Sequence, residues 1–180
     1  MAATHVALWR AVNLGKVGKL SMTELRELLT ELGLSDVKTL LQSGNAVFGA
    51  KGTTASLEKK LEAACASRLA LETEVFVRTA EEWAAIVDAN PFTKMAKSDP
   101  SHLVVVVLRG RPNADAVEEL RCAGGPEEIE VGDGCLYITY PNGMGRSKLD
   151  QHRAWKRLGA VGTARNWNTA TKIAAALGVR

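Results

Sequence analysis

The residues whose types and spacing could do chemistry gather in the last third of the chain. A glycine-rich stretch, Gly143-Met144-Gly145-Arg146-Ser147-Lys148, and a polar stretch, Arg165-Asn166-Trp167-Asn168-Thr169, each precede an expected helix. The free N–H groups at a helix start favour an anion, and arginine or lysine adds positive charge. We therefore expect contacts to a phosphate-bearing ligand from these stretches and the following helix, made by Arg146, Ser147, Lys148, Arg165, Asn166, Asn168 and Lys172.

The charge distribution points to the same end of the chain. Residues 141–180 hold eight Lys or Arg and one acid, which gives +7, whereas the first 140 residues hold 15 bases and 19 acids, which gives −4. Such asymmetry indicates an anionic partner, either a nucleotide or a single-stranded nucleic acid. Sheets that bind RNA usually carry aromatic residues on a central strand, and the apolar run at residues 103–108 has none. A small phosphorylated ligand is therefore favoured over RNA.

Two polar turns in the N-terminal half add further candidates. Gly15-Lys16-Val17-Gly18-Lys19 is similar to a phosphate-binding P-loop but fails its pattern, because Leu20 occupies the Ser/Thr position and Asn13 the first glycine position. Gln42-Ser43-Gly44-Asn45 is a tight turn. The candidate binding residues here are Arg10, Asn13, Lys16, Gln42, Ser43 and Asn45. The simpler interpretation of these loops is that the glycines make turns and the bases lie in solvent.

No catalytic or metal-binding pattern is present in the sequence. There is no nucleophile elbow and no histidine spacing typical of a metal site, so we name no catalytic residue, no metal site and no cofactor. The cysteines are isolated and lack the Cys-x-x-Cys spacing, which predicts buried, reduced thiols at Cys65, Cys122 and Cys135.

The elements that must position these residues follow the same order twice. In the first half we expect helices from Ser21 and Thr54, and strands over residues 6–9, 37–42, 45–48 and 73–78. In the second half we expect helices over 113–122 and 147–158, and strands over 103–108, 127–131, 135–140 and 160–165. The repeated βαββαβ order predicts an α+β fold of two ferredoxin-like split βαβ subdomains, with mainly antiparallel sheets and helices on one face.

Helix ends are predicted from capping residues. Ser21 with Glu24, and Thr79 with Glu82, are capping boxes, and Gly33 stands where a C-terminal cap belongs. A trailing helix therefore starts after Thr79. Single N-caps are expected at Ser147 and Asn168, the second opening the last helix.

Residues 90–101, with two prolines, are the most linker-like segment. We place the domain boundary there, which gives an N-terminal subdomain of residues 1–92 and a C-terminal one of residues 93–180. The longest apolar run, residues 103–108, is far shorter than the roughly 20 residues that a membrane helix needs. The opening residues also lack a signal-peptide pattern. We expect a cytoplasmic protein with no membrane contact.

Four sequence blocks resemble a bacterial family of uncharacterised proteins, catalogued as a domain of unknown function. The blocks lie around Arg10–Asn13, Gln42–Asn45, Arg146–Lys148 and Arg165–Thr169. The resemblance implies two ferredoxin-like halves, and it implies no activity. Ala11 is a departure, because relatives are expected to carry glycine there, which affects the turn after the first strand.

Three functional hypotheses follow. The first is a binding module for a phosphate-bearing ligand at the basic helix-start loops. The second is a small enzyme with a site assembled between the halves, for example from His5 or Asp150 meeting Ser147. The third is a protein-interaction or oligomerisation module whose basic end contacts an acidic surface.

Overall fold

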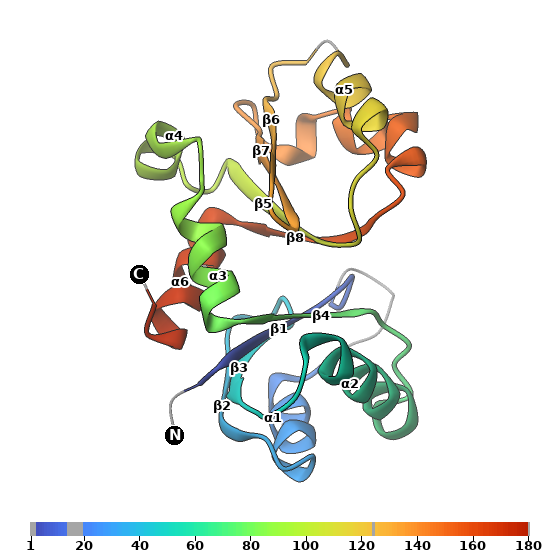
Figure 1. Cartoon of the computed structure of the whole chain (residues 1–180), viewed down its shortest axis with the longest axis vertical. Coiled ribbons are helices and arrows are strands. Elements are labelled where there is room, and N and C mark those ends of the chain that lie inside the picture. The colour runs from blue at the N-terminus through green and yellow to red at the C-terminus, as the bar shows by residue number, and fades with distance from the viewer. Residues whose placement is uncertain (1–2, 14–19, 124, 180) are drawn as a thin grey trace. The chain divides into compact units, whose positions relative to one another are not determined.

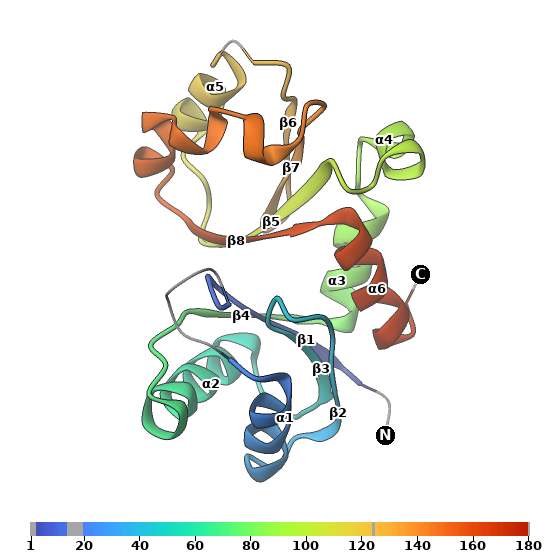
Figure 2. The same cartoon turned by 180° about the vertical axis from the view of Figure 1, so that it is seen from behind.

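A computed structural model describes residues 3–13, 20–123 and 125–179 of the chain. The chain divides into two compact units. The first consists of Met1–Val87 and Thr171–Arg180, and the second of Asp88–Ala170. Figures 1 and 2 show both units from opposite sides, and each unit is described by itself below.

The first unit has the predicted βαββαβ order. Its strands are β1 (His5–Trp9), β2 (Ser35–Thr39), β3 (Asn45–Gly49) and β4 (Val75–Thr79), and its helices are α1 (Met22–Glu31), α2 (Thr54–Leu69) and the trailing α3 (Ala80–Asp88). The sheet has the order β2-β3-β1-β4 with every pair antiparallel. Helices α1 and α2 cover one face of it (Figure 1).

Capping residues set most helix starts in this unit. Ser21 caps α1 by accepting a hydrogen bond from Thr23 N, and Gly33 follows the helix with a φ of 79°. The cap of α2 is Thr53, one residue before the expected start, and its hydroxyl accepts from Ser56 N at 3.2 Å. Both hydrogen bonds of the Thr79–Glu82 capping box are present. Glu82 N donates to Thr79 Oγ1 at 3.1 Å, and Thr79 N donates to Glu82 Oε2 at 2.8 Å.

The core of the first unit lies between the sheet and the two helices. Trp9 and Phe48 are fully buried there beside Leu25, Leu29 and Leu61 of the helices. Trp9 donates its indole N–H to Cys65 Sγ at 3.2 Å, which satisfies its one polar group inside the core. Burial raises the pKa of the Cys65 thiol, and this keeps it protonated.

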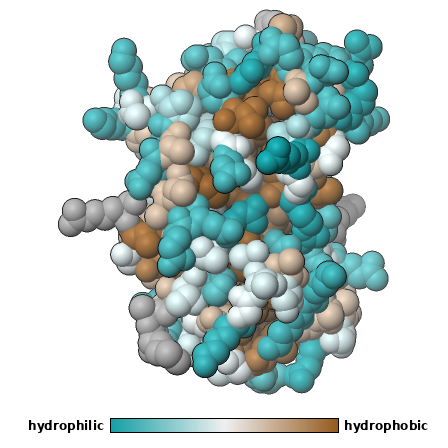
Figure 3. All heavy atoms as spheres, in the orientation of Figure 1, coloured by the Kyte–Doolittle hydropathy of each residue, from teal (hydrophilic) through white to brown (hydrophobic). Residues whose placement is uncertain are grey.

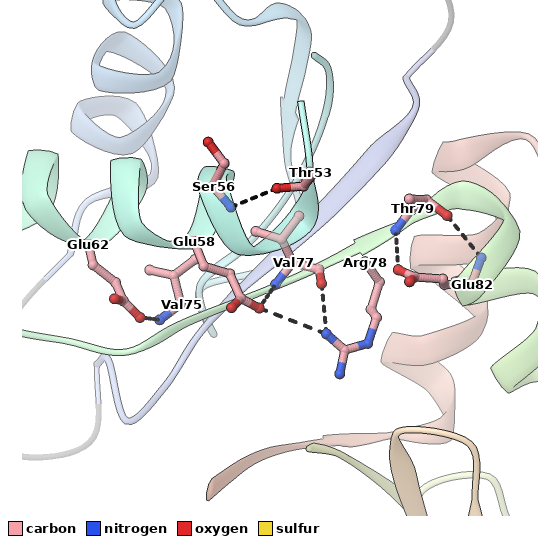
Figure 4. Close-up of polar contacts among 9 residues, drawn as sticks. All are labelled: Thr53, Ser56, Glu58, Glu62, Val75, Val77, Arg78, Thr79 and Glu82. Carbon is pink, nitrogen blue, oxygen red and sulfur yellow. Dashed lines mark hydrogen bonds and ion pairs between the residues drawn. The ribbon is translucent and has the colours of Figure 1, made fainter. Parts of the chain in front are cut away.

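Side chains cap the outer edge of β4, the last strand of this sheet (Figure 4). Glu62 and Glu58 of α2 accept hydrogen bonds from Val75 N at 3.0 Å and Val77 N at 2.9 Å. Arg78 donates to the carbonyl of Val77 at 2.7 Å. The edge amides of Val75 and Val77, together with the Thr79 amide held by Glu82, are therefore satisfied by carboxylates rather than by another strand.

The second unit repeats the same sheet topology. Its strands are β5 (Leu103–Arg109), β6 (Ile129–Gly132), β7 (Cys135–Thr139) and β8 (Val161–Asn166), and its helices are α4 (Thr93–Ser98), α5 (Ala114–Arg121) and the start of α6 (Trp167–Leu177). The sheet order is β6-β7-β5-β8, again antiparallel throughout. The α+β class with two ferredoxin-like sheets is therefore confirmed among the described residues.

The predicted helix over residues 147–158 is wrong. Three 3₁₀ turns replace it, η1 (Met144–Arg146), η2 (Leu149–Gln151) and η3 (Arg153–Arg157). Between the turns Ser147 and His152 have extended backbones, with ψ of 143° and 135°. The side chains of Ser147 and His152 accept hydrogen bonds from Leu149 N and Ala154 N. In a continuous helix these two amides would instead donate to backbone carbonyls.

The sheet register places the ends of β7 and β8. Thr139 at the end of β7 pairs with Leu103, and Asn166 at the end of β8 pairs with Val104. Both strands flank β5 and end at its first residues, so the loop after β7 and the start of α6 leave the same end of the second sheet. The 3₁₀ turns pack with α5 on one face of this sheet, around Leu149, Ala154 and Leu158 (Figure 2).

Within the described ranges no helix combines the length and the apolar character needed to cross a membrane. On the face shown in Figure 3, hydrophobic side chains reach the surface in patches between hydrophilic ones.

Candidate functional site

The basic loop after β7 lines a hollow of about 280 Å³ in the second unit. One wall is the segment from Asn142 to His152, and the other is the segment that joins α5 to β6, including Pro126 and Glu127. The two walls meet because Glu128 and Thr139 exchange hydrogen bonds, Glu128 N to Thr139 Oγ1 and Thr139 N to Glu128 O, both 2.9 Å.

Two cationic side chains stand at this hollow, Arg146 and Lys148. Both are exposed. Within the part of the chain that the structure describes, neither charged end is held by a hydrogen bond or an ion pair. Glu127 is the acid among the lining residues described, so the positive charge exceeds the negative. An uncompensated pair of cations attracts an anion, and phosphate accepts several charge-assisted hydrogen bonds.

Two further side chains at the hollow, Ser147 and His152, can donate hydrogen bonds. Ser147 Oγ accepts from Leu149 N at 3.0 Å, which leaves its hydroxyl proton for another acceptor. His152 Nδ1 accepts from Ala154 N at 3.3 Å, so the neutral ring carries its proton on Nε2. Each side chain therefore has an N–H or O–H that can be donated to an anion.

The neighbouring acid, Asp150, is engaged by a tyrosine. Tyr140 donates its hydroxyl to Asp150 Oδ1 at 3.0 Å. Burial and then the charge of Asp150 raise the pKa of Tyr140 well above its ordinary value of 10, so the phenol stays protonated and remains a donor. The Asp150 carboxylate is thus directed to Tyr140.

The charge of the C-terminal third is partly neutralised within the second unit. Glu119 of α5 pairs with both Arg153, at 2.9 Å, and Arg157. The +7 calculated for residues 141–180 therefore overstates the charge that a ligand meets. Arg146 and Lys148, on the loop that follows β7 (the Arg146 loop), have no such acidic partner among the described residues.

The structure does not bring Arg165 to this hollow. Arg165 lies opposite Val105 in the sheet, so the two side chains are on the same face. Val104 and Val106, on either side of Val105, belong to the core under the helices. Side chains alternate along a strand, so Arg165 lies on the face away from that core. It is 8% exposed and donates to Thr163 Oγ1 at 2.9 Å and to Ala164 O at 2.7 Å. Burial lowers the pKa of the Arg165 guanidinium to about 10, so it is still charged at neutral pH.

Asn166, and not Asn168, caps the last helix. Asn166 Oδ1 accepts from Thr169 N at 3.0 Å and from the Thr169 hydroxyl at 2.9 Å. Strand β8 runs directly into α6 at this residue, which puts Asn168 inside the first helical turn. Lys172 lies farther along α6, in the part that belongs to the first unit, and its side chain is exposed.

The N-terminal candidates serve mainly to hold turns together. Asn13 donates to Leu20 O at 2.9 Å and to Gln42 O at 2.6 Å, and it accepts from Leu20 N at 2.8 Å. Asn45 is fully buried and donates to Leu40 O and to Ser43 Oγ, both at 2.9 Å.

The remaining N-terminal candidates lie at the surface or outside the described residues. Arg10 is exposed and pairs with Glu74, and the side chain of Gln42 is exposed. Lys16 falls outside the described residues.

Sequence reasoning did not name Glu127, Asn142 or His152 as parts of a site. Asn142 and His152 lie within six residues of the Arg146–Lys148 motif, so closeness in the sequence could have indicated them as parts of the site. Glu127 precedes a different strand and reaches the hollow only through strand pairing. In the described residues no hydrogen bond joins the Ser147 hydroxyl to a histidine or a carboxylate, so this place has no nucleophile–base pair.

Comparison with known proteins adds a family and a fold. A family model described as "Protein of unknown function (DUF1697)" matches residues 2–137, and the match ends before the Arg146 loop. A solved structure, that of conserved bacterial protein SP0830 from Streptococcus pneumoniae, has a TM-score of 0.75 at 23% sequence identity, covering 98% of this chain and 99% of that one. No curated protein matches the sequence.

Proposed function

The chain belongs to this DUF1697 family of proteins of unknown function, and we propose that it is a binding module for a small phosphate-bearing ligand. The ligand lies in the hollow beside Arg146, Ser147 and Lys148. The observation that carries the proposal is the pair of cations at one hollow whose charged ends are not engaged by the described residues. The phosphate accepts from these cations, from the Ser147 hydroxyl and from His152 Nε2.

The size and lining of the hollow favour a mononucleotide or a sugar phosphate over a nucleic acid strand. A volume of about 280 Å³ is near the lower end for small-molecule sites. Glu127 offers an acceptor for a sugar hydroxyl. Proteins that bind single strands without sequence preference usually stack bases on exposed aromatic rings, and none of the nine aromatic side chains here is exposed.

The test is to titrate the full chain with adenosine 5′-monophosphate and with ribose 5-phosphate and to measure binding from the changes in amide chemical shifts. Adenosine, which lacks the phosphate, is the ligand control. We expect shifts at residues 142–149 with both phosphates and none with adenosine. The double variant Arg146→Gln/Lys148→Gln should bind at least about tenfold more weakly, since each lost charge-assisted bond costs about 1.5 kcal/mol or more.

A variant that loses the same charge elsewhere is the matched control. Lys38 and Lys51 are exposed residues of the first unit, and Lys38→Gln/Lys51→Gln should leave the affinity unchanged. Equal weakening in both double variants would mean that only overall charge matters. No shift with either phosphate would refute the proposal for this class of ligand.

Labelled single-stranded RNA and DNA distinguish the nucleic acid alternative. Fluorescence anisotropy at several salt concentrations should show weak binding or none, because the hollow offers phosphate contacts without stacking. Tight binding whose logarithm falls linearly with the logarithm of salt, and which is lost in Arg146→Gln/Lys148→Gln, would favour a nucleic acid partner instead.

A further inference from the structure

A second and larger hollow, of about 440 Å³, is present in the second unit. It is formed by the turn after β5, the helix α5 and the hairpin between β6 and β7. Its lining includes Arg111, Pro112, Val117, Val131 and Asp133, none of which lines the hollow beside Arg146. Val131 and Gly132 of this hollow pair with Leu136 and Cys135 at the start of β7. The Arg146 loop follows the other end of β7, so the two hollows lie at opposite ends of the second sheet.

An apolar side chain of the core face is exposed at this hollow. Side chains alternate between the two faces of a strand, so Val131 lies on the same face of β6 as Ile129. Ile129 is 3% exposed and belongs to the core under α5, and Leu136, the partner of Val131, is fully buried in that core. Val131 is nevertheless 48% exposed. The apolar face of the sheet therefore continues past the covering helix into the hollow, where Val117 of α5 and Pro112 also line it.

Two opposite charges stand among the lining residues of this hollow. Arg111 and Asp133 are both exposed, and no hydrogen bond or ion pair holds either charged group to another residue of the described ranges. Arg121 is engaged differently, since its guanidinium donates to Ile129 O at 2.9 Å and to Glu130 at 2.9 Å. Arg111 is thus the cation that can receive a ligand, and Asp133 opposes a second negative charge on that ligand.

We propose that this hollow binds a small amphipathic monocarboxylate. Its apolar body covers Val117, Val131 and Pro112, and its carboxylate pairs with Arg111. Burial of apolar surface supplies most of the affinity, and the guanidinium fixes the orientation with a bidentate contact. The volume is within the range of small-molecule sites, which begins at roughly 300 Å³. This site is independent of the phosphate hollow, and either can exist without the other.

Hexanoate is the probe that tests both parts of the ligand. The full chain is titrated with hexanoate, and the amides of Gly132 and Gly134 and the methyl groups of Val117 and Val131 are followed by two-dimensional NMR. We expect saturable shifts at these groups. Acetate, which has the charge but no tail, should bind at least about tenfold more weakly, because it buries much less apolar surface than the hexanoate chain. Hexylamine, which has the tail and the opposite charge, should also bind at least about tenfold more weakly.

Two single variants remove the two contacts separately. Val131→Asn and Arg111→Gln should each weaken hexanoate binding at least about fivefold, that is by about 1 kcal/mol. Both residues are exposed, and spectra that overlay with the wild type away from the hollow show that the variants fold. The matched controls are Val161→Asn, an exposed valine of β8, and Lys97→Gln, an exposed base of α4, and both should bind hexanoate as the wild type does.

Three results would overturn the inference. The first is no shift at the hollow up to about 20 mM hexanoate, since a dissociation constant above that concentration is too weak for a specific site. The second is equal binding of hexanoate and hexylamine, which would remove Arg111 from recognition. The third is unchanged affinity in both Val131→Asn and Arg111→Gln.

Discussion

Individual residues of the N-terminal blocks hold the backbone in turns. Asn13 has a left-handed φ of 58° and uses both ends of its amide to bond Leu20 and Gln42. A short polar side chain tolerates that conformation and bridges two chain segments at once. Asn13 and Asn45, two of the candidate ligands in these blocks, are therefore occupied by the chain itself, and the sequence alone does not distinguish these two uses.

Gly44 is required by both its conformation and its surroundings. Its φ is 68°, and a Cβ there would lie 2.4 Å from Val12 Cγ2 and 3.0 Å from Trp9 Cβ. We predict that Gly44→Ala lowers the free energy of unfolding by about 3 kcal/mol, from backbone strain of about 1–2 kcal/mol and overpacking of about 1–3 kcal/mol. Equilibrium unfolding in urea measures it.

Gly33→Ala separates the two causes. Gly33 also has a positive φ, 79°, but a Cβ would meet nothing within 4 Å. This variant should lose only the strain, about 1 kcal/mol. Equal losses in the two variants would show that the close approach to Trp9 and Val12 has no energetic effect.

Among the elements, β4 shows how a helix can protect the edge of a sheet. Glu58 and Glu62 are four residues apart and so lie on one side of α2. They accept from the amides of Val77 and Val75, which are two residues apart on β4 and face the same way. The spacing of the two carboxylates matches the spacing of the outward N–H groups. An uncapped edge of this kind is a template for pairing with another chain.

We predict that Glu58→Ala/Glu62→Ala destabilises the protein and makes it self-associate. Glu58 is 8% exposed, so its loss leaves a buried N–H without an acceptor, at a cost of about 1–3 kcal/mol. Urea unfolding and light scattering over a concentration series measure the two effects. Glu27→Ala, an exposed glutamate of α1, is the matched control and should change neither. A variant that keeps its stability and its concentration-independent mass would contradict the edge-capping role.

The sequence predicted elements well where a local motif decides them. The Thr79–Glu82 box and the Ser21 cap are present because the bonds involved span three residues or fewer. The helix over residues 147–158 was wrong because Ser147 and His152 each hold an amide two residues ahead, which a pattern of apolar positions does not reveal. Asn166 was missed as a cap because the strand before it continues to the helix without a loop.

For the molecule as a whole, each unit contains a group whose lowered pKa links stability to pH. In the first unit burial lowers the pKa of His5 below 6.5, against the smaller opposite effect of Glu81 and Glu82. In the second unit the Ser101 hydroxyl, at 2.7 Å, and then His102 lower the pKa of Asp99 below 3.8. A lowered histidine pKa favours the neutral ring in the folded state, and a lowered aspartate pKa favours the carboxylate.

We predict two separate pH windows for loss of stability. The contribution of His5 is complete above pH 6.5 and falls as the pH drops below it, with a slope of at most about 1.4 kcal/mol per pH unit. The contribution of Asp99 is complete above pH 3.8 and is lost as the pH falls through its lowered pKa. Urea unfolding between pH 3 and 8, in roughly half-unit steps, measures the profile.

Two variants assign the windows. His5→Gln should remove the slope just below pH 6.5, and Asp99→Asn should change only the acid end of the profile. Amide exchange of β1 and β5 shows which unit opens in each case. A profile of His5→Gln that still falls below pH 6.5 with the wild-type slope would contradict the role given to His5.

The candidate site could be predicted only in part. The basic motif Arg146-Ser147-Lys148 is visible in the sequence, because charge and glycine content are local properties. The opposite wall, with Glu127, is not, since it depends on the pairing of β6 with β7. The burial of Arg165 also depends on strand register, which decides the face on which a side chain lies.

The first unit is discontinuous, since Thr171–Arg180 belongs to it although the second unit comes between. During synthesis the ribosome releases the second unit, Asp88–Ala170, before those last residues emerge. The second unit is contiguous in the sequence, whereas the first unit also needs residues that follow the second unit. A released chain that lacks the residues after 170 would therefore contain all of the second unit but only part of the first, and a protease should cut the first unit more readily.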